Sequence, residues 1–146
     1  MKGSLLVDQI HRGLRPLGFR RRGLNVYRSA TEVYTVVNVQ RSAWGSGLYV
    51  NFGFSPPVEA PAGWLATSRC LVQFRAESVR DVEVAALRLL DETVGPSGTD
   101  VRAWAGIVDP TISLVTAAST VDGLREVLAT RVTAQRRVLW DAVLVS

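Results

Sequence analysis

The stretch of sequence that decides the fold runs from Gly18 to Ser55 and reads GFRRRGLNVYRSATEVYTVVNVQRSAWGSGLYVNFGFS. Two of its segments, residues 33–40 and 48–55, alternate apolar and polar side chains with a period of two. Such alternation, sustained over eight residues, is typical of a half-buried β-strand. Because residues 42–47 between them include two glycines, the two segments are predicted to form an antiparallel hairpin.

The register of this hairpin follows from which positions are apolar. The first segment carries its apolar side chains at odd positions, and the second carries them at even positions. The two apolar rows share a face only if odd residues lie opposite even ones, for example Val39 opposite Val50 and Val37 opposite Phe52. A slip of one residue would turn one apolar row toward solvent, so we expect this class of register.

An amphipathic helix is predicted before the sheet. Leu6, Ile10, Leu14 and Leu17 recur at spacings of four, four and three, which indicates a helix over residues 4–17.

The end of this helix carries two conformational signals. Pro16 lacks an amide donor and is expected to distort the last turn, and Gly18 sits where a left-handed residue ends a helix. Residues 19–22 then lead into the sheet, and residues 24–29 are predicted to form its first short strand.

A further strand is predicted after the hairpin. The proline-rich residues 56–63 cannot form a central strand, because proline supplies no amide donor to a sheet. Residues 69–76 alternate again, with Cys70, Val72 and Phe74 expected on one side of the strand.

The C-terminal half is predicted to be mostly helical. Capping patterns at residues 78–81 and 119–122 precede apolar helical segments, and the first of these helices is expected to end near residue 94. Asp109-Pro110 has the form of an N-cap followed by proline in the first turn. Residues 134–145 form a final amphipathic segment.

These elements predict one α+β domain over residues 1–146. It comprises an N-terminal helix, an antiparallel meander of about four strands, and a mostly helical C-terminal half packed on one face of the sheet.

Composition places the protein among compact soluble chains. Hydrophobic residues make up 47% and charged residues 21% of its 146 residues, and no apolar run approaches membrane-spanning length. The single cysteine, Cys70, excludes an internal disulfide and fits a reducing cytoplasm. Residues 1–58 hold eight basic and two acidic side chains, so this half is basic. A basic half can attract an acidic protein, a phosphate-bearing ligand or nucleic acid, or can simply be a solvated surface.

Several short strings resemble a known bacterial family. They are LRPLGFRRRG at residues 14–23 followed by Tyr27-Arg28, VVNVQRS at residues 36–42, and LYVNFG at residues 48–53. Together they resemble a family catalogued as domain of unknown function 4304. The resemblance implies a bacterial, cytoplasmic, single-domain α+β protein, and it implies no activity.

The residues needed for catalysis are scarce. Nucleophilic catalysis usually requires a nucleophile, a histidine base and an orienting group, yet the chain has one histidine, His11, and one cysteine, Cys70. Cys70 is expected to be a packed core thiol. A zinc site needs about four suitable ligands with recognisable spacing, and no phosphate-binding loop motif is present. We therefore expect a protein that is not an enzyme, with no catalytic residue, no metal and no cofactor.

One constellation suggests binding. Amide, phenol and guanidinium side chains are expected to share the sheet face opposite the apolar rows, where cross-strand neighbours form a contiguous patch. They are Tyr34, Asn38, Gln40, Tyr49, Asn51, Gln73 and Arg75. Such a patch can bind a ligand or partner, or it can be an ordinary solvated face. Trp44, at the tip of the predicted hairpin, is a candidate anchor for a partner.

Three function classes follow from these features. The first is a non-catalytic module that binds a protein through the basic half and Trp44, with an immunity-type or regulatory role as one form. The second binds nucleic acid through four arginines, and it would lose affinity steeply with salt. These are Arg20, Arg21, Arg22 and Arg28. The third binds a small ligand on the polar sheet face, which requires helices or loops to enclose that face. No membrane partner is expected, and a homodimer through the apolar residues 138–145 remains open.

Overall fold

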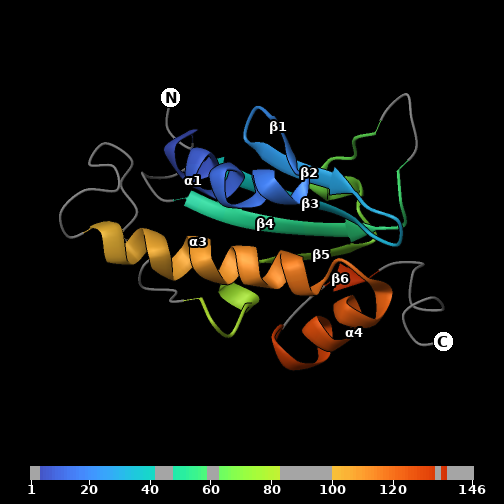
Figure 1. The fold of residues 1–146 in the computed structure, drawn as a ribbon. Coiled ribbons are helices and arrows are strands. Elements are labelled where there is room, and N and C mark those ends of the chain that lie inside the picture. Colours follow the sequence, from blue (N-terminus) through green and yellow to red (C-terminus); the bar gives the residue numbers. More distant parts are fainter. Residues whose placement is uncertain (1–3, 42–47, 59–62, 83–99, 134–135, 138–146) are drawn as a thin grey trace.

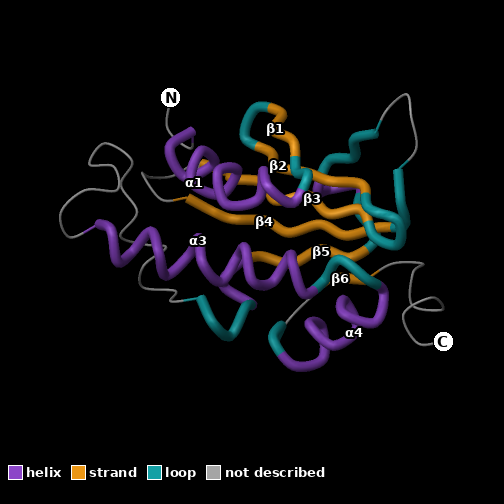
Figure 2. Tube along the Cα trace, viewed as in Figure 1, coloured by secondary structure: helices purple, strands orange, loops and turns teal. Residues whose placement is uncertain are grey.

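The structure, a computed structural model, describes residues 4–41, 48–58, 63–82, 100–133 and 136–137. Its centre is one antiparallel sheet whose strand order follows the chain order (Figures 1 and 2). The strands are β1 (Arg20–Arg22), β2 (Asn25–Ser29), β3 (Tyr34–Arg41), β4 (Leu48–Ser55), β5 (Val72–Arg75) and β6 (Arg136–Arg137). The predicted α+β meander is therefore confirmed, with short strands added at both edges.

The register of the central hairpin is the predicted one. Val39 lies opposite Val50, and Val37 lies opposite Phe52. These four side chains are buried in the main hydrophobic core. The alternation of apolar positions thus determines both the pairing of the strands and the face that they bury.

Helices cover one face of the sheet, as predicted (Figure 1). They are α1 (Ser4–Leu14), α3 (Asp100–Ala117) and α4 (Val121–Thr130). The core between the layers contains Leu6 and Ile10 of α1, Ile107 and Leu114 of α3, and Leu124 of α4. Packing against the sheet therefore holds all three helices on the same side.

The C-terminal end of α1 is determined by Pro16 and Gly18, as predicted. Because Pro16 lacks an amide donor, the α-helix stops at Leu14 and continues as a 3₁₀ turn over Arg15–Leu17. Gly18 follows with a φ of 90°, the left-handed conformation that glycine adopts without steric cost.

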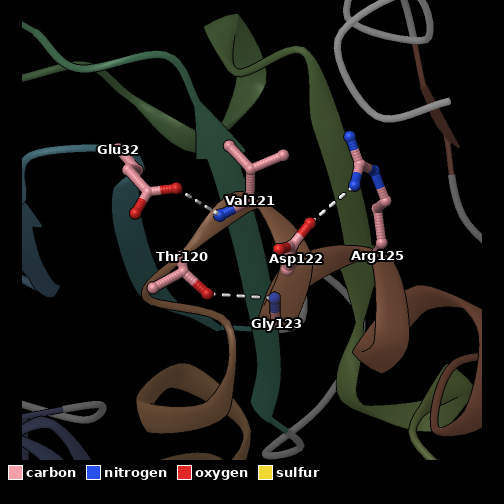
Figure 3. Close-up of polar contacts among 6 residues, drawn as sticks. All are labelled: Glu32, Thr120, Val121, Asp122, Gly123 and Arg125. Carbon is pink, nitrogen blue, oxygen red and sulfur yellow. Dashed lines mark hydrogen bonds and ion pairs between the residues drawn. The ribbon is translucent and has the colours of Figure 1, made fainter. Parts of the chain in front are cut away.

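The start of α4 is fixed from two parts of the chain (Figure 3). The Thr120 hydroxyl accepts a hydrogen bond from the Gly123 amide at 3.0 Å, as the capping pattern predicts. The Glu32 carboxylate, in the turn between β2 and β3, accepts one from the Val121 amide at 3.3 Å. This second cap joins the helix layer to the sheet.

The expectation that Asp109-Pro110 begins a helix is wrong. Pro110 lies inside α3, which begins at Asp100. The buried residues Ile107, Thr111 and Leu114 form one continuous stripe past the proline. Burial of this stripe outweighs the cost of one lost helical hydrogen bond.

Two further expectations for the C-terminal half need correction. Residues 78–82 do not begin a helix: Ser78 ends a 3₁₀ turn and Val79 forms an isolated bridge with Val132. Arg136–Arg137 pairs with β5 as a strand and does not begin an amphipathic helix. The rest of both expected segments, residues 83–94 and most of 134–145, lies outside the described residues.

In the part of the chain that the structure describes, no helix is long and apolar enough to cross a membrane.

Candidate functional site

The sheet face away from the helices carries a row of polar side chains, one from each of five neighbouring strands. Successive members lie directly opposite each other in the strand register. The row consists of Arg22, Asn25, Asn38, Asn51 and Arg75, and we name it the Asn–Arg row. It begins and ends with a guanidinium group.

Hydrogen bonds run along the Asn–Arg row in one direction. Arg75 Nε donates to Asn51 Oδ1 at 3.2 Å, and Asn51 Nδ2 donates to Asn38 Oδ1 at 3.0 Å. Asn38 Nδ2 then donates to Asn25 Oδ1 at 2.8 Å, and Asn25 Nδ2 donates to the Arg22 carbonyl at 3.1 Å. Each amide is therefore an acceptor toward β5 and a donor toward β1.

The two ends of the row determine how each amide is oriented. The guanidinium of Arg75 can only donate hydrogen bonds, and the backbone carbonyl of Arg22 can only accept them. An amide flipped by 180° would place two donors or two acceptors against each other somewhere between these ends. The orientation of all three asparagines is thus set by chemistry as well as by position.

A loop covers part of this face. We name residues 63–70 the roof segment; it ends in the 3₁₀ turn η2 (Thr67–Arg69) and Cys70. The Tyr34 hydroxyl donates to the Leu65 carbonyl at 2.7 Å and accepts from the Leu65 amide at 2.8 Å. Trp64 packs edge-on against Tyr27, with ring centroids 5.2 Å apart. These contacts attach the roof segment to β2 and β3.

Gly53 allows the roof segment to lie directly on the sheet. A Cβ atom at this position would be 2.7 Å from the Cys70 sulfur and 3.0 Å from a methyl group of Val36. Only glycine leaves room for so close an approach.

Cys70 therefore does not lie where its alternation predicts. It is the last residue of the roof segment, precedes β5 and packs on Tyr34 and Val36, whereas Val72 and Phe74 belong to the core on the opposite face. Burial raises the pKa of its thiol to about 12.

Between the roof segment and the Asn–Arg row lies a half-open cleft of about 590 Å³. Its floor consists of polar side chains from β2 to β5, namely Asn25, Asn38, Gln40, Asn51, Gln73 and Arg75. Its wall is formed by Trp64, Ala66, Thr67 and Ser68 of the roof segment. Among the residues that the structure describes, Arg75 is the one charged residue in this lining, and no carboxylate belongs to it.

Most of the predicted binding patch meets at this cleft. Five of the predicted residues line it, namely Asn38, Gln40, Asn51, Gln73 and Arg75. Tyr49 lies beside them, with its ring centroid 4.4 Å from the Arg75 guanidinium carbon. Tyr34 is fully buried and serves to hold the roof segment. Trp44 lies outside the described residues.

The structure divides the four candidate nucleic-acid arginines between the two faces. Arg20 and Arg22 share the face of the cleft, and the Arg22 guanidinium lies 5.2 Å from the Trp64 ring centroid. Arg21 forms an ion pair with Asp8 of α1. Arg28 donates to the Leu17 carbonyl at 2.8 Å and lies over the Phe19 ring, and its partial burial lowers its pKa.

Sequence reasoning missed two groups of cleft residues. Asn25 shares the parity of the polar face in its strand, so extension of the alternation from the central hairpin to β2 would have found it. The wall from Trp64 to Ser68 lies in an irregular segment without periodicity, and no sequence pattern indicates that it folds back over the sheet.

The two residues considered for nucleophilic catalysis are not brought together. His11 lies on α1, which packs on the core face, whereas Cys70 ends the roof segment on the opposite face. Among the described residues, no group of three or more histidine, cysteine, aspartate or glutamate side chains could hold a metal ion.

Comparison with known proteins identifies a family. Residues 10–93, more than half of the 146-residue chain, match the family model described as "Domain of unknown function (DUF4304)". The chain belongs to this family. The DUF4304 match confirms the resemblance seen in the sequence, and it includes β1 to β5 and the roof segment, so the complete lining of the cleft lies within it. No curated protein and no solved structure matches the chain.

Proposed function

We propose that this protein binds a small polar molecule in the cleft between the Asn–Arg row and the roof segment. The observation that carries the proposal is the roof itself, because a purely solvated sheet face needs no cover. A cleft of about 590 Å³ is within the usual size of small-molecule sites, about 300–1,000 Å³.

The cleft also has unused hydrogen-bonding capacity. An asparagine or glutamine amide carries two N–H donors. The Asn25 and Asn38 amides each use one of theirs within the described structure, and the Gln40 amide nitrogen uses neither. A ligand with several polar atoms would satisfy these groups.

The pre-organisation of the floor supports the same proposal. Each asparagine of the row is held by its neighbours, so the remaining donors of Asn25 and Asn38 have fixed directions before any ligand arrives. Fixed donors cost little side-chain entropy when a ligand binds. An ordinary solvated sheet face would not require such a connected network.

The other two functions considered from the sequence have less support. The protein-binding role depends on the basic N-terminal half and on Trp44, and Trp44 lies outside the described residues. The nucleic-acid role depends on four arginines, of which Arg21 and Arg28 are engaged on the face away from the cleft. We therefore favour ligand binding over both.

The test combines a compound panel with a variant that fills the cleft. Binding of amino acids, sugars, nucleotides, sugar phosphates and aromatic carboxylates is measured by saturation-transfer-difference NMR. Gln40→Trp places a large ring in the cleft from an exposed strand position, and Thr31→Trp adds the same ring at an exposed turn. We expect compounds that bind the wild type and Thr31→Trp to lose binding to Gln40→Trp. Equal binding to all three proteins, or no binding by any compound, would refute the proposal.

A further inference from the structure

We infer that the ligand of the cleft carries an oxyanion, a carboxylate or phosphate group, which is bound at the Arg75 end of the Asn–Arg row. This inference rests on the proposed ligand-binding function. It follows from three features of the cleft: its charge, the way Arg75 is held, and the balance of its donors and acceptors.

The charge of the cleft is positive. Arg75 lies at one end of the row and Arg22 at the other, where its guanidinium stacks on the cleft residue Trp64. No carboxylate lines the cleft among the described residues. A cation would therefore meet repulsion with no compensating acid, whereas an anion would gain charge-assisted hydrogen bonds.

The guanidinium group of Arg75 is held at its Nε and on one side of its plane, and its two terminal nitrogens are left for a ligand. Its Nε is bound by Asn51 at 3.2 Å, and its planar group lies against the Tyr49 ring. In the part of the chain that the structure describes, its two terminal nitrogens have no hydrogen-bond partner. A guanidinium supported at Nε and stacked on a ring presents its terminal nitrogens as a rigid fork, which matches the geometry of a carboxylate or phosphate.

The remaining hydrogen-bonding groups favour an acceptor-rich ligand. Both amide hydrogens of Gln73 are used, by the carbonyls of Ser68 at 3.1 Å and Cys70 at 2.8 Å, which holds its side chain against the roof segment. Donors remain on Arg75, Asn38 and Gln40, as described above. A carboxylate or phosphate only accepts hydrogen bonds at its ionised oxygens, so it suits a floor with this surplus of donors.

The test uses probe pairs that differ in the presence of the anion. These are benzoate and benzamide, indole-3-acetate and indole-3-acetamide, and glucose 6-phosphate and glucose. Affinities are measured by NMR titration at low and at physiological salt. We expect the anionic member of at least one pair to bind about tenfold or more tightly than its neutral partner, the effect of one charged hydrogen-bonded contact.

Arginine variants locate the effect. Arg75→Met should remove most of the preference for the anion, and Arg75→Lys should retain part of it, because lysine keeps the charge and loses the fork. Arg12→Met is the matched control, since it removes the same charge from α1 on the opposite face. Circular-dichroism melting curves check that each variant is folded. If Arg75→Met does not fold, the comparison of Arg75→Lys with the wild type still tests the inference.

Each outcome separates the two proposals. Tighter anion binding that Arg75→Met weakens and Arg12→Met leaves unchanged supports the inference. Equal binding of neutral and anionic probes overturns the oxyanion inference and leaves the ligand-binding function intact. Anion binding that Arg12→Met weakens as much as Arg75→Met overturns the inference, because it indicates general charge attraction. Absence of binding by every probe overturns both proposals.

Discussion

A single missing methyl group allows the roof segment to approach the sheet, so Gly53 should tolerate no side chain. In Gly53→Ala the new Cβ atom would lie 2.7 Å from the Cys70 sulfur and 3.0 Å from a methyl group of Val36. We expect the free energy of unfolding to fall by about 1–3 kcal/mol, as in other overpacked sites. Urea denaturation measures the change.

Gly106→Ala is the control for this substitution. A Cβ atom at Gly106 meets nothing within 4 Å, and the residue lies within α3. We expect it to stabilise the protein by about 0.5–1 kcal/mol, because alanine is the better helix former. A Gly53→Ala protein as stable as the wild type would contradict the close packing of the roof.

The hydroxyl of Tyr34 is the other residue-scale support of the roof. It satisfies both backbone groups of Leu65, so Tyr34→Phe leaves a half-buried amide and a half-buried carbonyl without this partner. We expect a loss of about 1–3 kcal/mol in the free energy of unfolding. Tyr49→Phe, whose hydroxyl has no hydrogen bond among the described residues, should change it by less than about 0.5 kcal/mol. Hydrogen exchange at the Leu65 amide should quicken in Tyr34→Phe alone.

At the scale of elements, α4 depends on caps from two places. Thr120→Ala removes the local cap on the Gly123 amide, and we expect it to cost about 1 kcal/mol of stability. Glu32→Gln removes a negative charge from the helix N-terminus and should cost less, with an effect that shrinks as salt is added. Chemical denaturation at two salt concentrations measures both. A salt-independent cost of Glu32→Gln would contradict the electrostatic role of this carboxylate.

An element could be predicted well when the residues that determine it are close together in the sequence. The β3–β4 hairpin was predictable with its register, because its two segments each alternate with a period of two, at odd positions in residues 33–39 and at even positions in residues 48–54. The start of α3 was not, because the local signal at Asp109-Pro110 is overridden by a buried stripe that only tertiary packing reveals. The side chain of Cys70 was predicted on the wrong face, because β5 begins only at Val72 and the alternation does not extend back to Cys70.

At the scale of the whole molecule, the roof makes stability sensitive to alkali. Burial raises the pKa of Cys70 from 9.0 to about 12, and raises the pKa of Tyr34 well above its ordinary value of 10.0. The folded state thus retains protons that the unfolded chain loses, so the stability that these groups contribute is complete below pH 9. It falls as the pH rises from about 9 toward 12 for Cys70, and from about 10 upward for Tyr34.

Urea denaturation at pH 8, 9.5 and 10.5 measures this loss. Lys2 is the one lysine of the chain, so few other side chains titrate in the same range. In Cys70→Ala the free energy of unfolding should fall less between pH 9.5 and 10.5 than it does in the wild type, whatever its value at pH 8. An unchanged slope would contradict the buried, protonated thiol.

The candidate site was predictable only in its floor. Alternation showed that Asn38, Gln40 and Asn51 would share a face, since strand parity is a local property. Whether that face is covered depends on where the chain returns after β4, and the roof segment has no periodic pattern to indicate this. The residues of the floor therefore do not predict the cleft, because the cleft forms only when the roof segment folds over them.

The strand register has one more consequence, for engineering. Immediately beside the Asn–Arg row, on the opposite face, runs a second row of Val26, Val37, Phe52 and Phe74, which belongs to the core. Each of the strands β2 to β5 therefore contributes one residue to the Asn–Arg row and its chain neighbour to the core. A library that randomises Asn25, Asn38 and Asn51 would explore new ligand preferences while the scaffold beneath stays constant. The sheet is therefore a suitable scaffold for the design of new binding proteins.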